Sequence, residues 1–169
     1  MKADIIQELH PNFAVFPTYS IILPFKQTDQ DVIDFYKRAN ATPIPGVPKL
    51  DSRRVVDGQR SITFYKPLPT TSDGSNFELR SKVLGVYDKG KPGTVVETEQ
   101  LIVNKDSGEV YTRAVGQGFY TGQGGWGGPK GEKAPNFNPP EGKKPDISST
   151  HQTSKATALL YRLNGDYSM

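Results

Sequence analysis

The sequence predicts an antiparallel β domain with helical segments towards its two ends. Its 169 residues are enough for a single core, and 34% of them are apolar. The 17 glycines and 14 prolines indicate many turns, which favours short strands over a helical bundle. Four consecutive segments in the middle of the chain carry strand-like patterns. Together these observations place the chain in the α+β class.

The first 49 residues carry helical and irregular patterns. Residues 1–10 predict a short helical lead, because their apolar side chains recur at helical spacing. Residues 16–23 form an apolar segment interrupted by Pro17, for which strand and helix both stay open. Residues 29–39 predict a short helix, with acids in the first turn and bases in the last. Residues 40–49 are rich in proline and predict a loop.

Residues 50–69 form the centre of the predicted sheet. The segment enters a strand after Asp57 and Gly58, and Pro67 ends it because proline donates no hydrogen bond to a sheet. Ile62 and Phe64 alternate with polar residues and give this strand one apolar face, which needs a cover. The predicted first strand therefore has one face towards the core.

Three further strands follow in a predicted meander. Asn104 opens a polar turn that ends at Gly108 and predicts a hairpin. Gly116 and Gly118 suggest a bulge or a close backbone approach in the last strand. The predicted strands cover residues 77–88, 94–103 and 110–120.

The composition changes abruptly after residue 120. Residues 122–131 are rich in glycine, and two interpretations stay open: an amide-rich loop around a phosphate, or a flexible loop pinned by Trp126. The spacing is not that of a P-loop or a dinucleotide fingerprint. We expect a Gly/Pro-rich connector over residues 121–149 and a helix over about 154–164, capped by Ser or Thr.

Composition and motifs exclude several classes of function. The chain has no cysteine, and its two histidines, His10 and His151, lack partners at ligand spacing, so we expect no metal site and no cofactor. The net charge of +3 is too small to indicate nucleic-acid binding. No stretch has the roughly 18 apolar residues of a membrane span. An intracellular protein, cytoplasmic or peroxisomal, is expected, although the ending Tyr-Ser-Met is not the peroxisomal address.

The candidate site residues are two carboxylates and a set of aromatic side chains. Asp57 and Asp166 each lie next to a glycine at the end of a predicted element. A buried carboxylate there could act as a general acid or base, whereas an exposed one shapes a turn. The aromatic side chains either line an apolar pocket or belong to the core. They are Tyr19, Tyr65, Phe119, Trp126 and Tyr161.

Four short motifs carry a resemblance to a known family. They are Phe-Pro-Thr at 16–18, Val-Asp-Gly-Gln at 56–59 with Tyr-Lys-Pro-Leu-Pro at 65–69, Gly-Gly-Trp-Gly-Gly at 124–128, and Leu-Tyr-Arg-Leu-Asn-Gly-Asp at 160–166. In this order they resemble segments of the type 2 enoyl-CoA hydratases, the MaoC-like dehydratases. The resemblance implies a hot-dog fold, an antiparallel sheet wrapped around a central helix, as one domain over residues 1–169. It also implies kinship with enzymes that add water to trans-2-enoyl-CoA to give (R)-3-hydroxyacyl-CoA.

The departures from the family pattern bear on the activity. Asp166 matches the family's catalytic aspartate, but Ser168 stands in place of its asparagine and the catalytic histidine has no counterpart. Loss of a general base typically lowers a rate by about 10²–10⁴-fold. The resemblance covers the N-terminal, acyl-accommodating half of two-domain members. We therefore expect a homodimer that rebuilds the double hot-dog.

Three functions stay open. The first is a repurposed enzyme whose apolar pocket shapes a polyketide-, fatty- or terpene-derived substrate for cyclisation, isomerisation or elimination. There Asp57, Tyr65 and Asp166 would be the acid–base or hydrogen-bonding groups, and Tyr19, Phe119, Trp126 and Tyr161 would contact the substrate. The second is an (R)-specific enoyl-CoA hydratase or dehydratase. The third is a non-catalytic subunit that binds an acyl thioester or completes a catalytic partner.

Overall fold

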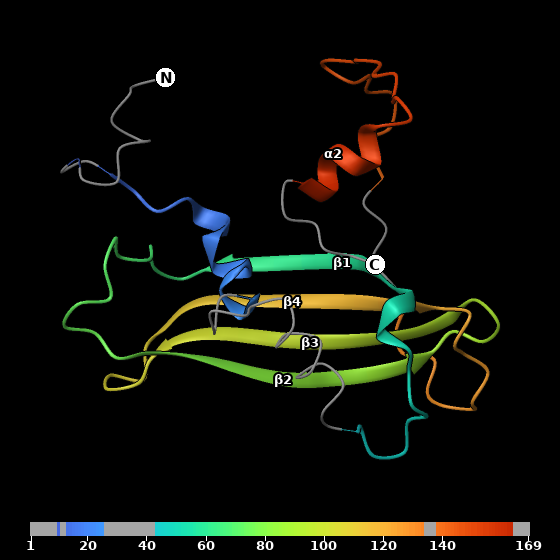
Figure 1. The fold of residues 1–169 in the computed structure, drawn as a ribbon, viewed down its shortest axis with the longest axis horizontal. Coiled ribbons are helices and arrows are strands. Elements are labelled where there is room, and N and C mark those ends of the chain that lie inside the picture. The colour runs from blue at the N-terminus through green and yellow to red at the C-terminus, as the bar shows by residue number, and fades with distance from the viewer. Residues whose placement is uncertain (1–9, 11–12, 26–42, 134–137, 164–169) are drawn as a thin grey trace. The chain divides into compact units, whose positions relative to one another are not determined.

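A computed structural model describes residue 10 and residues 13–25, 43–133 and 138–163. The chain forms two compact units, residues 1–131 and 132–169, and each is described by itself. Figure 1 shows that the first unit is built on one antiparallel sheet. The expectation of a single domain over the whole chain stays a prediction.

The sheet has four strands in the order β1-β4-β3-β2. They are β1 (Val55–Phe64), β2 (Phe77–Asp88), β3 (Gly93–Asn104) and β4 (Val110–Thr121). The predicted second to fourth strands are confirmed to within one residue at each end, and they follow one another as hairpins. The predicted meander is wrong for β1, which pairs with β4 instead of β2. Residues 65–76 connect β1 to β2, and this connection is too long for a tight hairpin. It allows the chain to cross from β1 at one edge of the sheet to β2 at the other.

β1 contains a bulge at Gly58, the position after which the sequence predicted that the strand begins. β1 starts at Val55 and continues through Asp57, which lies opposite Gly118. Gln59 then lies opposite Gln117, so Gly58 is an extra residue in the ladder. A Cβ added to Gly58 would lie 3.0 Å from the Gln117 backbone oxygen. The sequence suggested a bulge or close backbone approach at Gly116 and Gly118 of β4. The structure has a bulge opposite Gly118, but its extra residue is Gly58 of β1.

In the described part of the first unit, the buried apolar side chains lie on β2, β3 and β4. Its buried apolar side chains are Val86, Ile102, Val103 and Ala114. The Phe77 and Tyr111 rings pack edge to face with their centroids 5.1 Å apart. The predicted apolar face of β1 is only partly covered, since Ile62 is half-buried and Phe64 is 48% exposed. Among the described strands, β1 lies at one edge of the sheet and has β4 as its neighbour.

The segment whose type the sequence left open forms two short 3₁₀ helices, η2 (Pro17–Ile21) and η3 (Leu23–Phe25). Pro17 lies in the first turn of η2, where its fixed φ angle suits a helix start. Residues 43–50 contain no helix or strand, as predicted. The predicted helix at 29–39, and residues 1–9 of the helical lead predicted at 1–10, lie outside the described residues.

The second unit contains α2 (Thr157–Leu163), which confirms the predicted C-terminal helix. The Ser154 amide donates to the Thr157 hydroxyl oxygen at 2.9 Å, and the Thr157 amide donates to the Ser154 carbonyl at 3.1 Å. These bonds hold the turn that precedes the helix. Within the described parts of the chain, no helix is long and apolar enough to cross a membrane.

Candidate functional site

The sequence-predicted polar residues do not gather at one place in the sheet. Asp57 lies near the start of β1, and Tyr65 directly follows its end. At about 3.3 Å per residue, roughly 26 Å of strand separates them. The Asp57 carboxylate is 63% exposed and pairs with Arg60 at 3.1 Å. The catalytic roles of both residues stay predictions, as does that of Asp166, which lies outside the described residues.

The predicted aromatic residues are also spread over the chain. Tyr19 lies in η2 and is 44% exposed, whereas Phe119 lies in β4 opposite Val56. Tyr161 lies in α2 of the second unit and is exposed. Their roles as substrate contacts stay predictions.

A pocket of about 360 Å³ lies at the end of β1. The segment leading into η2 forms one wall, and the end of β1 with the residues after it forms the other. Tyr65 is the predicted site residue that contributes to this lining. The apolar lining comes from Val15, Phe16, Pro17, Phe64 and Leu68. A volume in the range of about 300–1,000 Å³ is typical of ligand pockets.

The polar groups of the pocket are few and mostly neutral. Lys66 pairs with Glu109, and this hydrogen bond raises the pKa of the Lys66 ammonium. Thr112 forms part of the lining and is 2% exposed, and its hydroxyl oxygen has no hydrogen-bond partner in the structure. The charge of Lys66 is thus offset within the protein, so the lining suits an apolar chain better than a charged group.

The glycine-rich loop at the opposite end of the sheet wraps around the Asp88 carboxylate. The amides of Gly90 and Gly125 donate to Oδ1 at 2.8 and 2.7 Å, and that of Gly127 donates to Oδ2 at 2.7 Å. Asp88 is 5% exposed. These bonds, led by that of Gly125, hold the pKa of Asp88 below its ordinary value of 3.8. The anion that these three amides bind is therefore the Asp88 carboxylate of the protein itself, and not the phosphate of a ligand.

Trp126 attaches the glycine-rich loop to β3 through a hydrogen bond to Thr94. This agrees with the interpretation of residues 122–131 as a loop pinned by Trp126. Its indole N–H donates to the Thr94 hydroxyl oxygen at 2.9 Å, and that hydroxyl donates to the Gln123 carbonyl at 2.7 Å. Thr94 is fully buried. A Cβ added to Gly128 would lie 2.0 Å from the Trp126 ring, so the ring covers the loop backbone closely. The contacts of Trp126 therefore fix the loop, and its predicted contact with a substrate stays untested.

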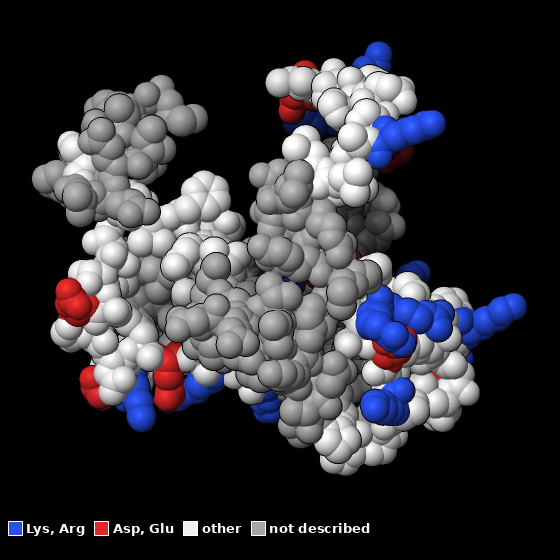
Figure 2. Space-filling model, viewed as in Figure 1, with Lys and Arg blue, Asp and Glu red and all other residues white. Residues whose placement is uncertain are grey.

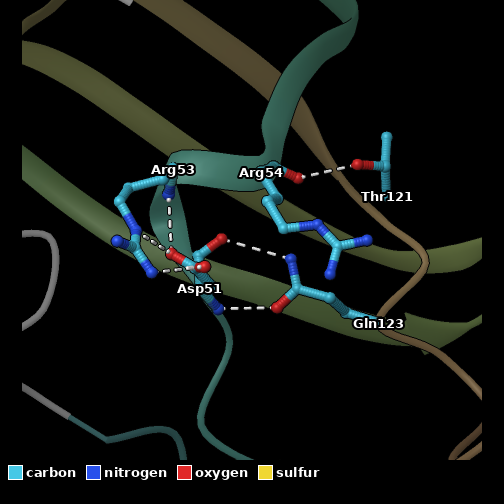
Figure 3. A network of polar contacts seen from close by, with 5 residues as sticks. All are labelled: Asp51, Arg53, Arg54, Thr121 and Gln123. Atoms are coloured by element: carbon cyan, nitrogen blue, oxygen red, sulfur yellow. Dashed lines mark hydrogen bonds and ion pairs between the residues drawn. The ribbon is translucent and has the colours of Figure 1, made fainter. Parts of the chain in front are cut away.

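A second polar network ties the loop to the start of β1 (Figure 3). The Asp51 amide donates to Gln123 Oε1 at 2.6 Å, and Gln123 Nε2 donates to the Asp51 carbonyl at 3.1 Å. Asp51 also caps η4 (Ser52–Arg54) by accepting a hydrogen bond from the Arg53 amide at 3.1 Å. The hydrogen bonds from Arg53 lower the pKa of the Asp51 carboxyl. Segments about 70 residues apart in sequence are thus joined at this end of the sheet.

Gly124 is a position in the loop where a side chain has no room. A Cβ there would lie 2.1 Å from the Gly90 carbonyl oxygen and 2.4 Å from that of Gly93. Both are backbone atoms, so Gly124→Ala is expected to lower the free energy of unfolding by about 3 kcal/mol. Chemical denaturation measures this loss. Gly116→Ala is the control, because its nearest neighbour would be Arg60 at 3.8 Å; an equal loss in both variants would contradict the clash.

The sequence of this chain is similar to that of known proteins. A family model described as the MFE-2 hydratase 2 N-terminal domain matches residues 2–122. The chain belongs to the MaoC-like, enoyl-CoA hydratase 2 family. It is 47% identical over 171 residues to the probable dehydratase NIT22 of Ajellomyces capsulatus, covering 98% of this chain and 45% of that relative. It is 28% identical to the probable enoyl-CoA hydratase 2 of Dictyostelium discoideum, covering 95% of this chain and 50% of the relative.

A solved structure supports the same family and its fold. The crystal structure of a MaoC-like dehydratase from Phytophthora Capsici matches with a TM-score of 0.66 and 30% identity. The match covers 95% of this chain and 52% of that one. It confirms the hot-dog fold that the sequence motifs implied. This MaoC-like chain spans about half the length of the relatives it matches.

Sequence reasoning missed Asp88, although it ends a correctly predicted strand. The signal available was the spacing Asp88-Lys-Gly90, which is typical of a turn in which the side chain binds a later amide. That spacing does not reveal Gly125, which is 37 residues further along. Within the described ranges, no group of three or more His, Cys, Asp or Glu is placed to hold a metal ion.

Proposed function

We propose that the chain takes part in the hydration or dehydration of acyl thioesters and supplies the pocket for the acyl chain. Family membership and the names of the relatives, a probable dehydratase and a probable enoyl-CoA hydratase, support the reaction class. The observation that carries the proposal is the apolar pocket of about 360 Å³ at the end of β1. Each methylene removed from water there favours binding by about 0.8 kcal/mol.

The pocket's own contribution is to bind and orient the substrate. Its lining, taken over the residues that the structure describes, contains no Asp, Glu or His, and Lys66 is paired with Glu109. The group that moves a proton to or from the substrate is therefore expected elsewhere, and Asp166 is our candidate. Holding a chain near its reactive geometry can lower a barrier by up to about 7–11 kcal/mol. Tyr65 is the lining residue whose hydroxyl could hydrogen-bond a polar part of the substrate.

The direct test compares thioesters of two chain lengths. Isothermal titration calorimetry with crotonyl-CoA and trans-2-decenoyl-CoA measures affinity, and loss of the enoyl absorbance measures water addition. We expect the ten-carbon thioester to bind at least tenfold more tightly, because the pocket removes its methylenes from water. Equal affinities would refute an acyl pocket. Tight binding without water addition would support the non-catalytic acyl-binding function.

The absence of an acid or imidazole from the described lining also suits a second candidate. A pocket that works by shape could promote cyclisation, isomerisation or elimination of a polyketide-, fatty- or terpene-derived substrate. Turnover that is abolished when the pocket is filled, but only reduced by Asp166→Asn, would favour this candidate over hydration. The cytoplasmic or peroxisomal location stays a prediction.

We also propose that the chain forms a homodimer through β1. This edge strand presents exposed apolar side chains, with Val56 at 52% and Phe64 at 48% exposure. Exposed apolar edge strands are usually covered in native proteins. Light scattering coupled to size-exclusion chromatography is expected to give twice the 18.6 kDa chain mass at micromolar concentration. A monomer under these conditions would contradict the proposal.

A further inference from the structure

One buried hydroxyl group in the wall of the apolar pocket has no partner in the described part of the protein. Thr112 of β4 contributes to the pocket lining and is 2% exposed. Its hydroxyl oxygen forms no hydrogen bond with any residue that the structure describes. Buried hydroxyl groups in native proteins are usually hydrogen-bonded, because leaving one unpaired lowers the stability of the fold. The fold itself therefore does not account for this hydroxyl.

The register of the sheet places Thr112 in a row of apolar side chains. Thr112 lies opposite Phe64 of β1 on one side and opposite Ile102 of β3 on the other. Ile102 in turn lies opposite Leu79 of β2. Residues directly opposite one another project from the same face of a sheet, and Ala114, two residues further along β4, shares that face. None of these four side chains carries a hydrogen-bonding atom, so the sheet surrounds the hydroxyl with hydrocarbon.

The rest of the pocket lining offers no free charge among the described residues. The segment leading into η2 contributes Val15, Phe16 and Pro17. Figure 2 shows an uncharged surface over η2, towards the left of the view. The lining therefore suits a neutral ligand. The Thr112 hydroxyl is itself neutral, and it can both donate and accept a hydrogen bond.

Ligand binding changes the energetic balance of an unpaired hydroxyl. A group that has no partner beforehand gains a hydrogen bond when a ligand oxygen reaches it, and it gives up no bond to water in exchange. An analogue without that oxygen leaves the buried hydroxyl unpaired. Sites of this kind therefore discriminate strongly between a ligand with the oxygen and one without it.

Tyr65 is the other hydroxyl-bearing residue in the described lining, and its environment differs. Its side chain is 57% exposed, so water can bond its hydroxyl before a ligand arrives. A ligand oxygen then replaces one hydrogen bond with another, and the net gain is small. Thr112 is shielded from water, so we expect Thr112 and not Tyr65 to select for an oxygen on the ligand.

We propose that the Thr112 hydroxyl donates a hydrogen bond to an oxygen substituent, a carbonyl or a hydroxyl group, on the chain of the acyl substrate. This inference rests on the proposed function, because it takes the pocket to hold that chain. Rotation about the Cα–Cβ bond exchanges the methyl and hydroxyl groups of a threonine, which lets the hydroxyl turn towards the pocket. The substrate class is thus an oxygenated acyl chain and not a plain hydrocarbon tail.

The test compares the unsubstituted chain with Thr112→Val, which keeps the branched shape and removes the hydroxyl. Titration calorimetry uses decanoyl-CoA and a series of oxodecanoyl-CoA thioesters, each with one chain carbonyl group at a position from C5 to C9. These chains are saturated, so no water is added to them. A carbonyl and a hydroxyl oxygen both accept from threonine, so the series probes both.

For at least one position of the carbonyl group, Thr112→Val is expected to weaken binding about tenfold, because the hydrogen bond to the ligand is lost. Decanoyl-CoA is expected to bind the variant at least as tightly as it binds the unsubstituted chain. Equal affinity of the two proteins for every oxodecanoyl thioester would overturn the proposal.

Ser20→Ala is the matched control. Ser20 in η2 is also buried, and its hydroxyl oxygen has no partner among the described residues, but Ser20 is not part of the pocket lining. This control is expected to bind the whole series as the unsubstituted chain does. An equal loss in the two variants would overturn the proposal, since the loss would then follow from removing any buried hydroxyl.

Chemical denaturation without ligand gives a second readout. Thr112→Val is expected to be at least as stable as the unsubstituted chain, because it loses no hydrogen bond within the protein. A lower unfolding midpoint would show that the hydroxyl serves the fold, and it would overturn the proposal. If decanoyl-CoA itself does not bind, the acyl pocket and this inference fail together. If it binds and Thr112→Val leaves the affinity for every oxodecanoyl thioester unchanged, this inference alone fails.

Discussion

Asp88→Asn is expected to release the glycine-rich loop and to lower the midpoint of thermal unfolding by roughly 10 °C. The carboxylate accepts hydrogen bonds from the amides of Gly90, Gly125 and Gly127 while it is almost fully buried. An asparagine has the same shape, but its NH₂ group cannot accept, so at least one buried amide loses its partner. The loop then loses the contact that orders its backbone.

Hydrogen exchange at the Gly125 and Gly127 amides measures the release directly, together with the unfolding midpoint. Asp57→Asn is the matched control, because Asp57 is exposed and its ion pair with Arg60 lies on the surface. We expect that control to change stability by less than about 0.5 kcal/mol. Unchanged protection of both amides in Asp88→Asn would show that the carboxylate does not order the loop.

The same contact makes the stability depend on pH. The folded-state pKa of Asp88 is lowered from 3.8 by the loop amides. The stabilisation is therefore complete above about pH 4 and is lost as the pH falls through the lower folded-state pKa. The Asp88→Asn variant should lack this part of the acid sensitivity.

Leu68→Trp is expected to lower the affinity for trans-2-decenoyl-CoA at least tenfold. Leu68 lines the apolar pocket and is half-buried in the proline-rich segment after β1. An indole at this position occupies volume that the acyl chain would otherwise take. Because the segment lies outside the sheet, the substitution is expected to change the free energy of unfolding by less than about 1 kcal/mol. Titration calorimetry with the ten-carbon thioester gives the dissociation constant.

Leu84→Trp serves as the control for Leu68→Trp. Leu84 is 39% exposed on β2 and is not part of the pocket lining. The control makes the same change in side-chain size, so it is expected to bind the thioester as the unsubstituted chain does. An unchanged dissociation constant for Leu68→Trp would place the acyl chain elsewhere in the protein.

Local patterns were sufficient to predict most of the sheet. Strands β2 to β4 have period-2 patterns bounded by turns, and the turn from Asn104 to Gly108 closes with an amide-to-carbonyl hydrogen bond of 2.8 Å. The beginning of β1 was predicted wrongly, because a glycine inside a strand produces the same local signal as a turn. The pairing of Gly118 with Asp57 shows that Gly58 bulges out of a continuous strand.

The candidate site was less predictable than the strands. Asp57 and Tyr65 are eight residues apart in sequence, and only the extended strand between them shows that they lie at opposite ends of β1. The pocket beside Tyr65 also depends on Val15 and Phe16, whose position relative to β1 carries no local signal.

The sequence by itself determined the α+β class, the three hairpin strands, the C-terminal helix and the family, because these follow from periodicity, turn residues and short motifs. The tertiary structure alone decided that β1 pairs with β4, that the Asp88 carboxylate occupies the glycine-rich loop, and which residues line the apolar pocket. The physical reason is the separation along the chain: these contacts join residues tens of positions apart, and no local pattern encodes which of them meet.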